Sequence, residues 1–294
     1  MATLRELKGR IGSVASSEKI TGAMKMISSA KMHRAEADLK RLLPFRSQIE
    51  SIIGNLLTAD ADFSSPLTEA REVKHAGVVV FGSDDGLCGG YNINIFKGLL
   101  AKIRDLRKTY GDTLQITLYP VGKKVAKACR KIQDTYINVS VPDGVNSKSD
   151  AEAIKALSFQ LQGLFTSGEV DRVELLYMNF QTVSRQRLRD DLYLPLDSTA
   201  LTAGGVKAVC RPCIFEPDAQ TIFRSVIPMY LLSMMQEVFT ENRASEQAAR
   251  IMAMQSANDN AKNLLEQLQL EYNKLRQQGI TNELLDILGG QVNN

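Results

Sequence analysis

Apolar and small residues recur every three or four positions in the last quarter of the chain. They occupy positions 244, 248, 251, 254, 257, 261, 264, 268, 272 and 275. Between Met229 and Gln278 there is neither glycine nor proline, and strong helix formers fill the segment. This spacing predicts one long helix with a single apolar stripe, lined by alanine in its first half and by leucine in its second.

The first 57 residues show the same period. Their stripe comprises Leu4, Leu7, Ile11, Val14, Thr21, Met24, Ile27, Ala35, Leu39 and Leu42, and it resumes with Ile49, Ile52, Ile53 and Leu56. Pro44 is expected to kink or interrupt this helix, and Gly22 costs about 1 kcal/mol relative to alanine. Because neither helix can bury its stripe alone, we expect the two ends of the chain to pair antiparallel, as a rod of about 80 Å at about 1.5 Å per residue.

Short β-rich runs alternate with helical segments in the middle of the chain. Strands are expected at 76–81, 114–119, 135–139 and 171–182, and helices at 93–110, 123–132 and 150–166. Such alternation favours a mostly parallel sheet with crossover helices. Arg185, Arg187 and Arg189 alternate as on a strand with one solvent-facing side. The predicted fold class is therefore α/β, with an N-terminal coiled-coil helix at 1–57, a central α/β domain at 73–217 and a C-terminal coiled-coil helix at 218–290.

The charge of the chain is uneven, although its net value is only +3. Nine basic and four acidic residues lie between Arg5 and Arg41. Such an arm is either a solvated helix face or a surface for an acidic partner. A nucleic-acid or scaffold protein that uses this arm is an alternative, but no clustered aromatic platform accompanies it, so we expect no nucleic-acid partner.

The four cysteines are expected to be reduced and structural. No secretory signal precedes them and no window of 18 apolar residues exists, which favours an intracellular protein without a membrane span. Cys210 and Cys213 have CxxC spacing, but a zinc site would need two further ligands and the chain has only His33 and His75 as histidines. We expect neither a metal nor a cofactor.

A glycine-rich loop follows the first predicted strand and runs from Gly82 to Asn92, with the sequence GSDDGLCGGYN. A phosphate cradle is one interpretation of such a loop. However, it matches neither GxGxxG nor a Walker sequence, and Asp84 and Asp85 would repel phosphate. We therefore expect a structured turn that makes a protein contact. With no acid–base constellation in a recognisable frame, an independent catalytic site is not expected.

The stretch ITGAMKM at 20–26, the loop SDDGLCGGYN at 83–92 and the pattern AARIMAMQSANDNA at 248–261 occur in an order that resembles the gamma subunit of F-type ATP synthases. The first lies within the block 4–31. The third lies within a block that runs from Ser245 to Gly290 and also contains EYNK at 271–274 and ITNE at 280–283. The resemblance covers the whole chain and implies an antiparallel coiled coil with a Rossmann-like domain at its base.

The resemblance also implies a role: a rotor shaft in the central stalk, present in one copy, that couples ion-driven rotation of the c-ring to conformational changes of catalytic beta subunits. The implied partners are the alpha and beta ring, the epsilon subunit and the c-ring, with indirect, peripheral attachment at the cytoplasmic face of a bacterial inner membrane. By position, the implied beta-subunit contacts are Lys8, Lys25, Cys88, Arg250, Gln277, Thr281 and Glu283, and those of a hydrophobic bearing are Leu284, Ile287 and Leu288.

Two positions depart from the family pattern. Asp85 stands where arginine is usual, and Gly22 stands where a larger, often charged residue is common. The main alternative to a rotor is an α/β enzyme with a coiled-coil dimerisation arm, which would bind a ligand at Gly82–Gly90.

Overall fold

The computed structural model describes residues 3–57, 64–197 and 215–291, with the side chains given as far as residue 285. A five-stranded sheet forms the centre of the α/β domain, in the order β3-β2-β1-β4-β5. The strands β1 (His75–Phe81), β2 (Gln115–Val121), β3 (Ile137–Val139) and β4 (Arg172–Thr182) are parallel, and β5 (Arg185–Leu194) is antiparallel to β4. The α/β fold class expected from the sequence is confirmed.

Alternate residues of the strands supply two separate cores, one on each face of the sheet. Val78 and Val80 of β1 pack against α2 (Tyr91–Tyr110) and α3 (Lys123–Cys129). Val79 and Phe81 face the opposite way, toward α4 (Ala151–Ser167) and the base of the shaft. The sheet is therefore covered on both faces, which explains why its strands are nearly continuous apolar runs.

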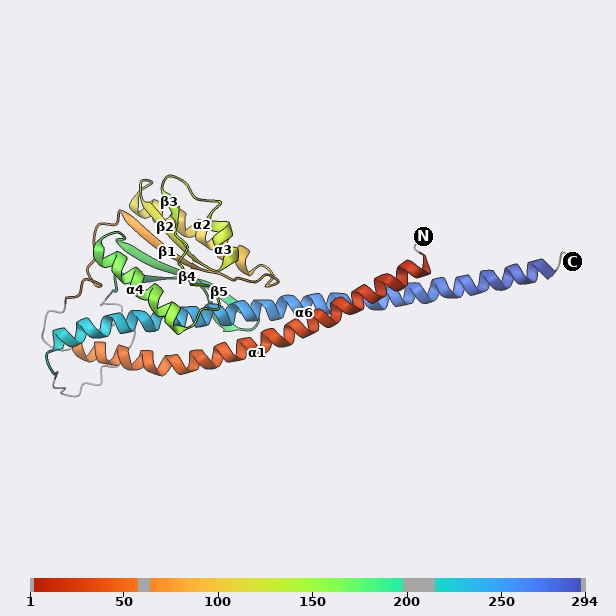
Figure 1. The fold of residues 1–294 in the computed structure, drawn as a ribbon, viewed down its shortest axis with the longest axis horizontal. Helices are drawn as coiled ribbons and strands as arrows, with labels where there is room; N and C mark the ends of the chain where they lie inside the picture. Colours follow the sequence, from red (N-terminus) through yellow and green to blue (C-terminus); the bar gives the residue numbers. More distant parts are fainter. Residues whose placement is uncertain (1–2, 58–63, 198–214, 292–294) are drawn as a thin grey trace.

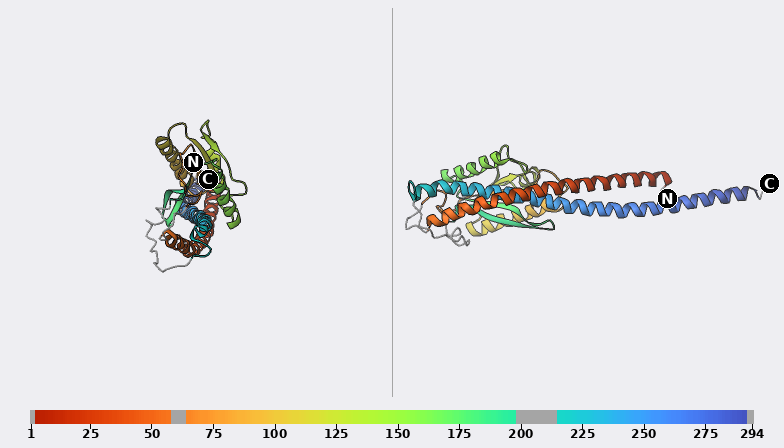
Figure 2. Two further views of the ribbon diagram at one scale, coloured as in Figure 1. Left: turned by 90° about the vertical axis from the view of Figure 1, so that its left-hand side faces the viewer. Right: turned by 90° about the horizontal axis from the view of Figure 1, so that it is seen from below.

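The two terminal helices form the shaft. α1 (Leu4–Leu57) and α6 (Ala219–Gln291) run antiparallel along the long axis, and the α/β domain lies beside the part of the shaft where α1 ends and α6 begins, on the left of Figure 1. The right-hand view of Figure 2 shows the same rod-like shape, with α6 extending beyond the start of α1, and the left-hand view looks along the rod. From residue 276 to 285 the side chains of α6 are exposed except for the half-buried Gly279. The far end of the shaft is therefore a single helix.

The expectation that Pro44 interrupts the first helix is wrong. The helix is continuous through Pro44, and α6 likewise begins before Pro228 and continues through it. Pro44 is solvent-exposed, while Ile49, Ile53 and Leu56 anchor the following turns in the core on the shaft side of the sheet. The packing of those turns offsets the one helical hydrogen bond that proline removes.

The seam between the two helices follows the predicted period with four exceptions. Leu4 and Ile52 of the predicted stripe are 39% and 44% exposed, and at two further positions a neighbouring residue is more buried instead. Leu7 and Ala35 of α1, and Ala244, Ala248 and Leu268 of α6, are buried as expected. Ile27 is 55% exposed, and the neighbouring Ser28 is buried in its place. Leu264 is 45% exposed, while Leu265 is half-buried. At Ile27 and at Leu264 the next residue takes the seam position. A period of three or four residues allows either choice, so the sequence alone does not decide between them.

Candidate functional site

The glycine-rich loop lies at the carboxyl end of the parallel strands, between β1 and α2. This edge is where open α/β sheets commonly bind ligands. The loop is closely packed: a Cβ on Gly122, whose φ is +112°, would lie 3.0 Å from the carbonyl carbon of Gly82 and 3.0 Å from the Ser83 carbonyl oxygen. Glycine is therefore required where β2 turns into α3.

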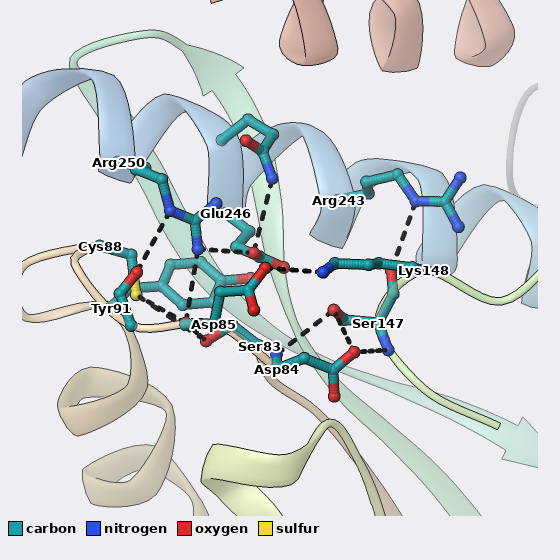
Figure 3. Close-up of polar contacts among 12 residues, drawn as sticks. Ser83, Asp84, Asp85, Cys88, Tyr91, Ser147, Lys148, Arg243, Glu246 and Arg250 are labelled. Carbon is teal, nitrogen blue, oxygen red and sulfur yellow. Dashed lines mark hydrogen bonds and ion pairs between the residues drawn. The ribbon is translucent and has the colours of Figure 1, made fainter. Parts of the chain in front are cut away.

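Asp84 fills the position that an anionic ligand would take at this edge. Its carboxylate accepts hydrogen bonds from the Lys123 amide (2.9 Å), the Ser147 amide (3.1 Å) and the Ser147 hydroxyl (2.9 Å). Ser147 belongs to the loop after β3 and lies beside Asp84 in Figure 3, and Lys123 is the first residue of α3. The side chain thus joins three loops, and the backbone donors that could hold a phosphate already hold a carboxylate of the chain itself.

Asp85 forms an ion pair at the surface of the same loop. Its carboxylate lies 2.7 Å from the Lys148 ammonium group. This hydrogen bond, helped by the nearby charges of Arg250 and Lys31, lowers the pKa of Asp85. The acid at this unusual position therefore has basic neighbours from α1, α6 and the loop that follows β3.

Arg250 of α6 holds the loop against the shaft. Its guanidinium donates to the carbonyl oxygens of Gly86 (3.2 Å) and Asp85 (3.4 Å), and to the Glu246 carboxylate (2.8 Å). Arg250 and Glu246 are both buried. Burial raises the pKa of Glu246, against the opposing effect of the Arg250 charge. The predicted contact residue Arg250 therefore faces its own chain.

A second group of polar contacts joins the domain to the preceding turns of α6. The Tyr91 hydroxyl donates to the Asn242 side-chain oxygen (2.7 Å), and Arg243 donates to the Ser149 carbonyl oxygen (2.7 Å). The Ser245 hydroxyl donates to the Met178 carbonyl oxygen (2.8 Å). Together with Arg250, these residues attach the α/β domain along about two turns of the helix.

The apex of the loop presents a residue that the sequence analysis did not single out. Leu87 is 60% exposed and has a φ of +63°, a positive value that no other non-glycine residue shows in the part of the chain that the structure describes. The predicted contact residue Cys88 is buried beside it, 3.3 Å from the Asn92 amide nitrogen. An exposed leucine held in a left-handed conformation is the stronger candidate for a contact.

The other predicted contact residues lie along the shaft and are not brought together with the loop. Lys8, Gln277, Thr281 and Glu283 are exposed, and Lys25 is partly buried. Leu284 is 56% exposed on the single-helix end of α6. Ile287 and Leu288 belong to α6, but their side chains lie outside the described residues, as do Cys210 and Cys213.

Comparison with known proteins identifies the family. A family model described as ATP synthase matches residues 3–292. The ATP synthase gamma chain of Parabacteroides distasonis is 40% identical over 290 residues, covering 99% of this chain and 98% of that protein. The gamma chain of Phocaeicola vulgatus is 41% identical over 296 residues, covering 99% and 100%. The chain belongs to the ATP synthase gamma chain family.

The fold agrees with solved structures of such assemblies. A chain of the Euglena gracilis mitochondrial ATP synthase superimposes with a TM-score of 0.64 at 19% identity, covering 98% of this chain and 93% of that one. At this identity the likeness concerns the fold. Family membership gives the chain the role of the central-stalk subunit of an F-type ATP synthase. Among the described residues, no helix is both long and apolar enough to cross a membrane.

Proposed function

We propose that the chain turns inside a ring of alternating alpha and beta subunits and drives each beta subunit through its nucleotide-binding states. The observation that carries this proposal is the shape of the shaft. The C-terminal end of α6 is a single exposed helix, whereas the opposite part of the shaft is a helix pair with the α/β domain on one side. An asymmetric axle contacts each surrounding subunit differently, and differential contact is what shifts a population of conformations.

The contacts with the ring are assigned to the part of the shaft that runs from the glycine-rich loop to the projecting end of α6. Lys8 and Lys25 on α1 and the loop with Leu87 and Cys88 would face acidic loops of beta. Gln277, Thr281 and Glu283 would face the upper part of the ring, with Leu284, Ile287 and Leu288 in a hydrophobic bearing. Arg250 is retained as a beta contact only if the loop above it moves, because its guanidinium is buried in this structure.

The base of the molecule is assigned to the epsilon subunit and the c-ring, so that attachment to a bacterial inner membrane is peripheral and indirect. ATP chemistry is assigned to the beta subunits. The hydrogen bonds of Asp84 support the assignment of ATP chemistry to other subunits. The backbone amides of Lys123 and Ser147, which could hold a nucleotide phosphate, already bind the Asp84 carboxylate.

Coexpression with the alpha, beta and epsilon subunits of the same organism tests the proposal. We expect a complex with one copy of this chain, and ATP-driven rotation that is weakened by deletion of residues 264–294. Calorimetry of the purified chain with ATP or NAD should show no binding. A stable chain that never joins the ring, or one that binds a nucleotide by itself, would overturn the assignment.

A further inference from the structure

Asn258 is a polar side chain in the otherwise apolar and small-residue seam of the shaft. It lies on α6, is 9% exposed, and crosses to α1. Its amide nitrogen donates to the Glu18 carbonyl oxygen at 2.8 Å and to the Thr21 hydroxyl at 3.3 Å. A buried amide that bonds to the partner helix is the kind of group that fixes the register of paired helices.

The facing surface of α1 is shaped to receive this amide. The Thr21 hydroxyl donates to the carbonyl oxygens of Ser17 (3.0 Å) and Glu18 (2.9 Å), so toward Asn258 it acts as the acceptor. Gly22 leaves open the adjacent space, where a Cβ would lie 3.4 Å from the Asn258 nitrogen. Gly22, which departs from the family pattern, therefore lies where the Asn258 amide bonds to α1.

The packing differs on the two sides of this crossing. Toward the domain, Met32, Ile251 and Met254 fill the seam. Toward the tip, the helices enclose an open groove of about 780 Å³, and a Cβ on Gly9 or Gly12 would meet nothing within 4 Å. Among the described residues, no hydrogen bond joins the helices beyond Asn258 on this side. Small side chains and open space specify register poorly.

We propose that Asn258, with the Glu18 carbonyl and the Thr21 hydroxyl, is the positioning residue that fixes the register of α1 against the part of α6 that follows Asn258. A slip of one heptad toward the tip would place the amide against Ile11 and Val14, which offer no side-chain partner. The amide would then lose the Thr21 acceptor, and the methyl group of Ala15 would stand where Gly22 leaves space, which makes the slipped pairing unfavourable. Between Asn258 and the tip the seam alone does not exclude such a slip, since its small residues repeat at the same period. Because Ile49, Ile53 and Leu56 hold the other end of α1 in the core, the slip would require a local interruption of α1 between that anchor and Asn258.

Spin labels on the full-length chain test the register directly. Keto amino acids at positions 16 and 274, both exposed, carry the labels, so the native cysteines stay in place. We expect one narrow distance in the parent chain. Asn258→Leu should add a second population displaced by roughly 10 Å, the length of one heptad of helix. Gly22→Val, which crowds the amide from the other side, should broaden the distance in the same way.

Asn260→Leu is the matched control, because Asn260 is exposed on the same turn. It should keep the single narrow distance. The melting temperature separates a register role from a merely stabilising one: Asn258→Leu should melt no lower than the parent, since leucine packs well in the seam. A single unchanged distance in Asn258→Leu and Gly22→Val would overturn the proposal, as would a lowered melting temperature without a second population.

A changed register should also alter the coupling of ATP hydrolysis to ion pumping. This expectation rests on the proposed rotor function, whereas the distance measurement does not. In the assembled complex, Asn258→Leu should lower the number of ions pumped per ATP hydrolysed, while Asn260→Leu should not. A failure to assemble would contradict the rotor proposal and leave the register result standing. Normal coupling in a complex whose free chain shows two registers would overturn the link between register and function.

Discussion

Arg250 belongs to the shaft by sequence but acts as part of the loop that it holds. Its three bonded groups are the carbonyl oxygens of Asp85 and Gly86 and the Glu246 carboxylate, and its side chain is buried. Gly86 and Asp85 precede Arg250 by 164 and 165 residues in the sequence, whereas Glu246 precedes it by only four. The periodicity of α6 gives no sign of the long-range pair, and the family resemblance implied an external contact for Arg250 by position alone.

Arg250→Ala should destabilise the chain by about 3 kcal/mol, because it leaves Glu246 as a buried charge without its partner. Urea unfolding followed by circular dichroism measures this loss. Arg276→Ala on the exposed end of the same helix is the control, and we expect a change within about 0.5 kcal/mol. Equal effects of the two substitutions would show that the buried contact adds nothing to stability.

Glu246 should make stability depend on pH in the direction opposite to that of an ordinary paired acid. Its folded-state pKa is raised by burial above the value of 4.5. Between that raised pKa and about 4.5 the folded chain binds a proton that the unfolded chain does not, so this contribution grows as the pH falls and is lost as the pH rises.

Glu246→Gln removes this titration. The stability of the parent relative to the variant should therefore increase as the pH falls from 7 toward about 4.5, as measured by urea unfolding of both chains at each pH. Glu266→Gln, at an exposed position of the same helix, serves as the control and should show no such trend. A difference between parent and Glu246→Gln that stays constant with pH would contradict the expectation.

The close contact of β1 with α3 explains a glycine that sequence patterns attribute to a phosphate loop. A Cβ on Gly82 would lie 2.2 Å from the Val125 Cγ2 atom. Gly82 therefore allows the first turn of α3 to approach the end of β1. The requirement is steric and internal to the domain, and it needs no ligand.

Gly82→Ala should cost about 1–3 kcal/mol through overpacking, measured as a shift of the urea midpoint. The additional change Val125→Ala should recover part of this loss by removing the clashing methyl groups. Gly163→Ala in α4, where a Cβ would meet nothing within 4 Å, should instead stabilise by about 0.5–1 kcal/mol. A Gly82→Ala chain as stable as the parent would show that the two segments can separate freely.

The helices and strands followed from short-range patterns, and the exceptions have a common cause. β1, α2, α4 and β4 lie within a few residues of their predicted bounds, because the two strands are nearly continuous apolar runs and each of the two helices buries one regular face. Asn258 and Ser28 were not placed in the seam, since their burial depends on the partner helix. The contacts of Asp84 with Lys123 and Ser147 depend on which loops meet at the sheet edge, which no local period encodes.

The projecting end of the shaft lies outside the packed part of the molecule. Side chains 276–285 are exposed, including Leu284 and Leu285 at 56% and 59%. Exposed leucines on a lone helix contribute little to the stability of the free chain. They instead suit a surface that is covered after assembly.

Removing residues 276–294 should therefore leave the free energy of unfolding of the isolated chain within about 1 kcal/mol of the parent value, as judged by urea unfolding. The same deletion should weaken ATP-driven rotation in the assembled complex. Leu7→Ala, which empties a fully buried seam position, should show the contrasting effect and lower the stability of the isolated chain. A marked destabilisation by the deletion would mean that the lone helix packs on the rest of the chain.

The pairing of the first and last helices also has a consequence for biosynthesis. α1 ends at Leu57 and α6 begins at Ala219, so 161 residues must be translated before the partner of α1 starts to emerge from the ribosome. At about 5–20 residues per second, the nascent α1 waits on the order of 10–30 s with its apolar stripe uncovered. During that interval it is a natural client for a chaperone, and a pause in translation before codon 219 should increase its aggregation.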